Sequence, residues 1–289
     1  MAEEIWTLKA ALDWTLGYLA EKGDEHPRLS AEWLLSAATG LSRVEIYAYH
    51  ERPLTPDERG VLREAVRRRA AGEPLQYVTG EVAFRHIVVK VRPGVLIPRP
   101  ETEVLVDEVL SAISGSNAAR IADVCTGSGC IALAIAHENE AARVWSSDIS
   151  PIAVHVAREN AERLGLTERV AVLEGDLLDA LPGELRGTLD VVVSNPPYVP
   201  SANVPVLPTE VAGFEPHLAL DGGSDGLDVF RRLMRESREW LAPGGLLAVE
   251  LDEGMVATAA EEALQWYEEV RVISDLAGRD RIVTARQVR

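Results

Sequence analysis

Apolar residues in the first 75 or so positions recur at intervals of three and four. One set of apolar residues lies before Gly23, and a second set ends just before Gly40. The two sets are Leu8, Leu12, Leu16 and Leu19, then Ala31, Leu34, Leu35 and Ala38. This period places each set on one face of a helix, so the pattern predicts amphipathic helices that pack together.

The clearest helix start in this region is Thr55-Pro56-Asp57-Glu58. Thr55 can cap the helix, Pro56 suits its first position, and Glu58 stands three residues after the cap, as a capping box requires. The helix is predicted to run to about Ala71 and to stop at Gly72.

A strand-rich stretch follows, from Tyr77 to Val91, interrupted near Arg85-His86 and closed by Pro93-Gly94. Two short apolar runs around a break favour a β-hairpin. We therefore expect a helical domain over residues 1–75 and a β-hairpin linker over residues 76–98.

From about residue 100 the pattern changes to short apolar runs separated by helical segments. The strand candidates are Ile121–Val124, Val144–Ser147, Val170–Leu173, Asp190–Ser194, Leu246–Leu251, Val270–Ser274 and Ile282–Ala285. The clearest helix begins at Ser150-Pro151 and ends at Gly165. Such alternation predicts an α/β domain over residues 99–289, with a mostly parallel sheet covered on both faces.

Composition agrees with a globular protein: 47% of the 289 residues are apolar and 26% are charged. No apolar run approaches the length that crosses a bilayer. The acidic start MAEEIWTLKA lacks the basic segment followed by an apolar segment that is typical of a signal peptide. We expect a cytoplasmic enzyme with no membrane contact.

The net charge of −17 is unevenly distributed: residues 1–80 carry −3 and the remaining residues carry −14. Proteins that hold nucleic acid usually present a basic face. The acidic part of the chain is therefore a poor candidate for direct DNA binding.

The two cysteines, Cys125 and Cys130, flank a glycine loop. Their spacing is not that of zinc ligands, and no second Cys/His pair completes a set of four. We expect free thiols and no metal.

The first motif with chemical content is the loop from Cys125 to Gly129, which follows the first strand of the α/β region and leads into a helix. Glycines there allow a ligand close to the backbone, and the helix start offers free N–H groups. The loop residues Cys125, Thr126, Gly127, Ser128 and Gly129 are therefore candidates for contact with a ligand, and the family resemblance given below implies that this ligand is the cofactor.

Two acidic positions extend this site. Asp148, at the end of the second strand, can bind both hydroxyls of a ribose. Asp176 and Leu177 follow the third strand and suit the edge of an adenine ring. A nicotinamide dehydrogenase would share this layout, but it normally has a further glycine where this chain has Ala132, so the loop alone leaves the cofactor open.

The most informative motif is Asn195-Pro196-Pro197-Tyr198, at the end of the fourth strand, where open α/β sheets hold their ligands. The prolines stiffen the backbone and remove N–H donors, so carbonyl oxygens nearby stay free to accept. Asn195 adds an acceptor, and Tyr198 adds a flat face. Such a site suits a planar –NH₂ group held against a methyl donor.

With these motifs the chain resembles the bacterial release-factor glutamine methyltransferases. The resemblance covers nearly the whole length and includes segments beyond the loop and the Asn195–Tyr198 motif. These segments are Gly72–Tyr77, Ile97–Glu103, Phe214–Pro216 and Gly278–Arg281.

The resemblance implies a seven-stranded Rossmann-like methyltransferase domain that uses S-adenosyl-L-methionine, preceded by a helical domain that helps to dock a peptide-chain release factor. It implies that Asn195 contacts the cofactor and the glutamine amide of the substrate, and that Asn195, Pro196 and Tyr198 form the catalytic motif. Pro196, Pro197 and Tyr198 would complete the substrate pocket, with Leu96 at one of its walls. Two positions depart from the family pattern: Cys125 replaces the usual glycine, and Leu96 stands where some relatives place an aromatic residue over the substrate.

Two alternatives stay open at this point. An adenine methyltransferase acting on nucleic acid would use the same Asn-Pro-Pro-Tyr logic on a flipped base. A cofactor-binding but inactive protein could act through its helical domain alone, although intact Asn195 and Tyr198 favour an enzyme.

Two further features of the helical region carry expectations. Arg59, Arg63 and Arg67 would stripe one helix face, which is either solvated or in contact with a release factor or ribosomal RNA. Trp6, Trp14 and Trp33 are expected to pack into the core of the helical domain.

Overall fold

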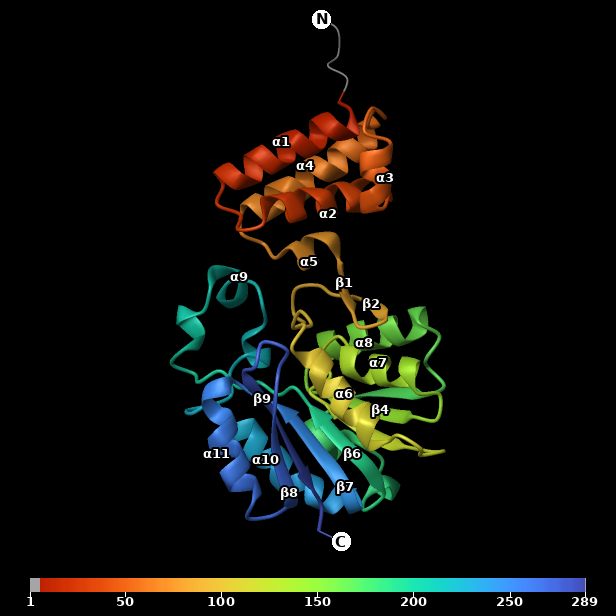
Figure 1. Cartoon of the computed structure of the whole chain (residues 1–289), viewed down its shortest axis with the longest axis vertical. Coiled ribbons are helices and arrows are strands. Elements are labelled where there is room, and N and C mark those ends of the chain that lie inside the picture. Colours follow the sequence, from red (N-terminus) through yellow and green to blue (C-terminus); the bar gives the residue numbers. More distant parts are fainter. Residues whose placement is uncertain (1–5, 289) are drawn as a thin grey trace, which may run out of the picture. The chain divides into compact units, whose positions relative to one another are not determined.

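The computed structural model describes residues 6–288, so the acidic start at residues 1–5, used above against a signal peptide, lies outside the described residues. The chain forms two compact units, residues 1–81 with 208–214 and residues 82–207 with 215–289. Figure 1 shows the elements of both.

The first unit is helical. Its elements are α1 (Leu8–Glu21), α2 (Pro27–Thr39), α3 (Arg43–Ala48), α4 (Pro56–Ala70), α5 (Leu75–Thr79) and α9 (Thr209–Ala212). The leucines predicted from their spacing form its core, where Leu8, Leu19, Leu34 and Leu35 are fully buried. Arg69, at the end of α4, pairs with Asp24 and with Glu210, both at 2.7 Å, which explains why residues 208–214 belong to this unit.

The capping box of α4 is confirmed. The Glu58 N–H donates to Thr55 Oγ1 at 3.2 Å, and the Thr55 N–H donates to Glu58 Oε2 at 2.8 Å. Pro56 occupies the first turn, and Ala71 caps the carboxyl end. On the exposed face of this helix Arg67 is paired with Glu64 at 2.5 Å, so part of the arginine stripe is neutralised.

Two sequence predictions for this region are wrong. Tyr77–Thr79 is not strand but part of α5, because Pro74 starts a helical turn that buries Tyr77 and ends at the left-handed Gly80. Trp14 and Trp33 are 47% and 40% exposed, since both lie on the side of their helices away from the buried stripe. Trp14 instead stacks on Tyr18, with ring centroids 5.1 Å apart.

The second unit begins with the predicted hairpin, β1 (Glu81–Phe84) and β2 (Ile87–Lys90), turning at Arg85-His86. Phe84, Ile87 and Val89 are buried in the core of this larger unit. The hairpin is therefore packed against the α/β domain rather than free of it.

A seven-stranded sheet forms the centre of the second unit, in the order β5-β4-β3-β6-β7-β9-β8. All neighbouring pairs are parallel except those made by β9, which is antiparallel to β7 and β8. The predicted α/β fold is confirmed, and each strand candidate lies within or overlaps an observed strand. The strands are β3 (Arg120–Val124), β4 (Arg143–Asp148), β5 (Val170–Glu174), β6 (Leu189–Ser194), β7 (Leu241–Glu250), β8 (Glu268–Ser274) and β9 (Asp280–Arg286).

Helices cover both faces of this sheet (Figure 1). One face is covered by three helices, α6 (Thr102–Ala112), α7 (Cys130–Glu138) and α8 (Pro151–Arg163), which share a hydrophobic core with Ile121 of β3. The other face is covered by α10 (Asp228–Trp240) and α11 (Glu253–Ala263), which share a second core with Ala122 of β3. Successive residues of β3 thus point to opposite cores, as a doubly covered strand requires.

Short 3₁₀ turns lie at Leu177–Ala180, Gly183–Leu185, Val204–Val206 and His217–Ala219. Because β3, β4, β5 and β6 are parallel, the polar residues at their ends meet at one edge.

Candidate active site

A cavity of about 190 Å³ opens at the carboxyl edge of the parallel strands. Most of the residues singled out in the sequence line it, together with residues from the β2–α6 segment and from α10. The predicted residues that line it are Leu96, Cys125, Gly127, Asp148, Asp176, Leu177, Asn195 and Pro197. Thr126, Ser128, Gly129, Pro196 and Tyr198 do not line it.

The residues of the loop after β3 that are not in the cavity wall shape the turn beneath it. Thr126 is buried and its hydroxyl donates to Asp123 at 2.6 Å. The Ser128 carbonyl accepts from the Asn160 side chain at 2.9 Å. Gly129 begins α7 at a φ of 81°, where a Cβ would come within 3.1 to 3.2 Å of Leu133 and Ala157. A side chain at Gly129 would therefore crowd the packing between α7 and α8.

Asp148 is tied to this loop from the neighbouring strand. Its Oδ2 accepts the Gly127 N–H and its Oδ1 accepts the Ser150 N–H, both at 2.9 Å. Burial raises the pKa of Asp148, and the backbone donors oppose that rise. A third backbone N–H, that of Ile149, also acts on this carboxylate, so the side chain is fixed at the cavity wall. A carboxylate offers about four acceptor sites, so acceptor capacity remains beyond these three donors.

Cys125 occupies a backbone conformation that usually takes glycine, with a φ of 60°. Burial, with the nearby Asp148 carboxylate, raises the pKa of the thiol well above its ordinary value. The thiol is therefore protonated at neutral pH and is no nucleophile. Both cysteines are free thiols in the structure.

We expect Cys125→Gly to preserve or tighten binding of a ligand in this cavity and to leave the fold intact. Glycine adopts a positive φ without the steric cost of a Cβ and widens the cavity at that point. Calorimetric titration of the ligand, with thermal unfolding in parallel, measures both effects. A large loss of affinity would show that this chain has adapted to the thiol.

Asp176 and Leu177 form the wall of the cavity beyond β5. Leu177 is buried with a φ of 48°, and its carbonyl accepts the buried Ser147 hydroxyl at 2.8 Å. Asp176 Oδ2 pairs with Arg232 from α10 at 2.9 Å, and both side chains line the cavity. This part of the cavity wall therefore presents the apolar surface of Leu177 beside the polar pair of Asp176 and Arg232.

Asn195 follows β6 directly, and its side-chain amide is held from behind. Nδ2 donates to Glu250 Oε1 at 3.1 Å and to Thr102 Oγ1 at 3.2 Å. Pro196 is buried, Pro197 faces the cavity, and Tyr198 packs beside the core that contains α10 and α11. Burial raises the pKa of Tyr198 well above its ordinary value, so its hydroxyl stays neutral.

Sequence reasoning assigned no role to several residues that shape this site. Asp123 and Glu250 are buried carboxylates at the ends of β3 and β7, and burial raises the pKa of each to about 7. An acid at the carboxyl end of an apolar strand, next to a strand that carries a motif, is the signal that could have identified Glu250. Arg99 donates to both oxygens of the buried Glu215 at 2.7 Å, which ties two motif segments together.

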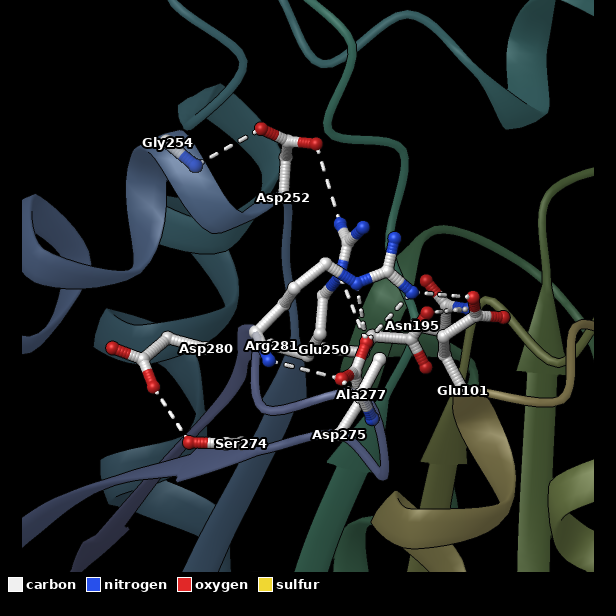
Figure 2. A network of polar contacts seen from close by, with 11 residues as sticks. Glu101, Asn195, Glu250, Asp252, Gly254, Ser274, Asp275, Ala277, Asp280 and Arg281 are labelled. Carbon is white, nitrogen blue, oxygen red and sulfur yellow. Dashed lines mark hydrogen bonds and ion pairs between the residues drawn. The ribbon is translucent and has the colours of Figure 1, made fainter.

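A network of polar contacts surrounds Asn195 and Glu250 (Figure 2). Arg279 donates to Glu101 at 3.0 Å and to Asp275 at 2.9 Å, and Arg281 donates to Asp252 at 3.3 Å. The segment Gly278–Arg281 and the start of α6 are thereby joined beside the end of β7. Both segments, Gly278–Arg281 and Ile97–Glu103, are among those that carry the family resemblance.

Within residues 6–288, no group of three or more His, Cys, Asp or Glu side chains is placed to hold a metal ion. In the same part of the chain, no helix is both long and apolar enough to span a bilayer.

Models of known protein families match parts of both units. Family models match at residues 10–80, described as PrmC N-terminal domain, and at residues 100–207, described as Methyltransferase small domain. A release factor glutamine methyltransferase of Geobacter sulfurreducens is 49% identical, over 88% of this chain and 87% of the relative. The enzyme of the same name from Moorella thermoacetica is 48% identical, over 96% of this chain and 98% of the relative.

Among solved structures, the hMettl16 catalytic domain in complex with MAT2A 3'UTR hairpin 6 superposes with a TM-score of 0.56 and 16% identity. The match covers 69% of this chain and 74% of that chain. At that identity the similarity extends to the fold alone, which is the methyltransferase α/β fold.

Proposed function

Because the chain belongs to the family of release factor glutamine methyltransferases, we propose that it methylates the side-chain amide nitrogen of the glutamine in the Gly-Gly-Gln motif of peptide-chain release factors, using S-adenosylmethionine. One observation supports this proposal above the others. Asn195 opens onto the same cavity as Asp148, with its Nδ2 held by two buried acceptors and its Oδ1 left for a substrate.

The cavity residues fit S-adenosylmethionine, which supplies an electrophilic methyl group. Asp148 would accept the ribose hydroxyls with its remaining lone pairs. Leu177 and Asp176 would contact the adenine, one through its apolar surface and the other through its polar edge. A Cβ at Gly127 would meet nothing nearer than Val95, at 3.9 Å, so there is space for the chain of the methionine moiety over the loop from Cys125 to Gly129.

The catalytic role of the Asn195–Tyr198 motif is to present the amide nitrogen. Asn195 Oδ1 would accept one amide hydrogen and the carbonyl region of Pro196 the other, while Pro197 and Leu96 form pocket walls and Tyr198 supports the motif. An amide nitrogen is a poor nucleophile because its lone pair is delocalised, so holding both hydrogens favours the transition state. No strong base is needed, because the methylated amide can release its extra proton to water.

The adenine methyltransferase alternative predicts a different acceptor. Its support is the shared Asn-Pro-Pro-Tyr logic, and the acidic charge of residues 81–289 weighs against it and against direct DNA binding. Labelled methyl transfer from S-adenosylmethionine to a purified release factor, beside single-stranded and duplex DNA, separates the two. We expect label in the release factor; label in the DNA alone would favour the alternative.

We further expect a folded release factor to be methylated with a far higher specificity constant than a short peptide containing Gly-Gly-Gln. The helical unit would contribute docking energy remote from the chemistry, through surfaces such as the stripe of Arg59, Arg63 and Arg67. Steady-state kinetics with both substrates measures the ratio. Equal specificity constants would remove the docking role of the helical unit.

A further inference from the structure

We propose that Glu250 and Thr102 are positioning residues that hold the Asn195 amide in the orientation that accepts a hydrogen bond from the substrate. The inference rests on the proposed function, since it concerns how Asn195 receives the glutamine amide. It adds two residues to that site, and both act through Asn195, because neither lines the cavity.

Asn195 lies between the cavity and these two side chains. Its Nδ2 is 3.1 Å from Glu250 Oε1 and 3.2 Å from Thr102 Oγ1, and each of the two partners is only 2% exposed. Among the described residues, none donates a hydrogen bond to Asn195 Oδ1. The buried contacts therefore engage the amino end of the side-chain amide and leave the oxygen for the cavity.

The chemistry of the two partners decides which end of the amide they receive. An ionised carboxylate can only accept, so it stabilises Nδ2 and repels Oδ1. A threonine hydroxyl can donate or accept, so Thr102 alone would permit either orientation. Glu250 consequently selects the orientation and Thr102 reinforces it. A rotated Asn195 would present N–H groups to the substrate N–H, and no hydrogen bond could form.

The charge of Glu250 depends on pH near neutrality. Burial raises its pKa to about 7; the Thr102 hydroxyl, Arg281 and Asn195 oppose this rise, and the Glu101 carboxylate adds to it. The nearby Tyr198 and Cys130 are neutral, because burial raises the pKa of each well above its ordinary value. Arg281 also forms ion pairs with Asp252 and Asp275, so its charge is not directed to Glu250 alone. Above this pKa the carboxylate orients Asn195, whereas the protonated carboxyl can donate and loses that selectivity.

The test uses Glu250→Gln and Thr102→Val in single-turnover methyl transfer to a release factor, at saturating S-adenosylmethionine. A glutamine can offer Asn195 either its oxygen or its amino group, and a valine offers no polar group. We expect each variant to be about tenfold slower, the effect of weakening one hydrogen bond, with cofactor affinity unchanged. The parental rate should rise as pH passes through about 7, and the Glu250→Gln rate should lack that rise.

Thermal unfolding separates positioning from loss of structure. The folded-state pKa of Glu250 lies above the ordinary 4.5, so the native state holds a proton that the unfolded state has released, and stability falls as pH rises from 4.5 to about 7. Removing the buried charge in Glu250→Gln should therefore leave the melting temperature above pH 7 equal to or higher than the parental one. A slower yet equally stable variant is the expected result.

Thr284→Val is the matched control for Thr102→Val. Thr284 is fully buried in β9, and its hydroxyl has no hydrogen-bond partner among the described residues. The same change there should leave the rate at the parental level. In an Asn195→Ala background, Glu250→Gln and Thr102→Val should cost nothing further, because their effect passes through Asn195.

Undiminished rates in both variants, or additive losses in the Asn195→Ala background, would overturn the positioning role while methyl transfer by the parental enzyme leaves the proposed function intact. A parental enzyme that transfers no methyl to the release factor would overturn both.

Discussion

Asn195→Ala is expected to lower single-turnover methyl transfer to a release factor by about 10²-fold or more, the scale for removing one group that hydrogen-bonds in the transition state. Asn195 lines the cavity and its Nδ2 is engaged by Glu250 and Thr102, so the substitution removes the Oδ1 acceptor that we propose for the substrate amide. The measurement is made at saturating cofactor and release factor.

Asn195→Asp provides the matched control for this prediction. It keeps an acceptor but places a carboxylate against Glu250, so it should retain part of the activity with altered cofactor affinity. Calorimetry on Asn195→Ala should show most of the cofactor affinity preserved. A parental rate of transfer in Asn195→Ala would show that the amide is not held in this way.

Asp148→Ala is expected to weaken S-adenosylmethionine binding by about 1.5–3 kcal/mol, the value of a hydrogen bond to a charged group. The loss of the carboxylate also leaves the Gly127 and Ser150 N–H groups without their acceptor, which should lower the free energy of unfolding. Isothermal calorimetry measures the affinity, and denaturant unfolding measures the stability.

Asp148→Asn separates these two effects, because the asparagine keeps one side-chain oxygen and the volume of the residue. We expect it to lose less stability than Asp148→Ala and still to bind the cofactor more weakly than the parent. Unchanged cofactor affinity in both variants would remove Asp148 from the ribose role.

Elements defined by local patterns could be predicted from the sequence. The capping box of α4 and the alternation of strands and helices after residue 100 depend on neighbours in the chain, and the structure contains both. Helix α5 was missed because Tyr77, Val78 and Thr79 favour strands by themselves, and burial of Tyr77 decides otherwise.

The predicted candidate site was incomplete for a related reason. Residues at the ends of β3, β4 and β6 were identified because each follows an apolar run. Glu250 and Thr102 come from β7 and α6, and only the folded sheet brings them to Asn195. Sequence spacing likewise could not show that Thr126 and Ser128 lie beneath the cavity wall rather than in it.

The most direct measurement of the central claim is mass spectrometry of a purified release factor incubated with this protein and S-adenosylmethionine. The account predicts one added methyl group, on the side-chain nitrogen of the glutamine in Gly-Gly-Gln, and no addition when that glutamine is replaced by alanine or when Asn195→Ala is used over the same short time. An unmodified glutamine, or a methyl group on another residue, would contradict it.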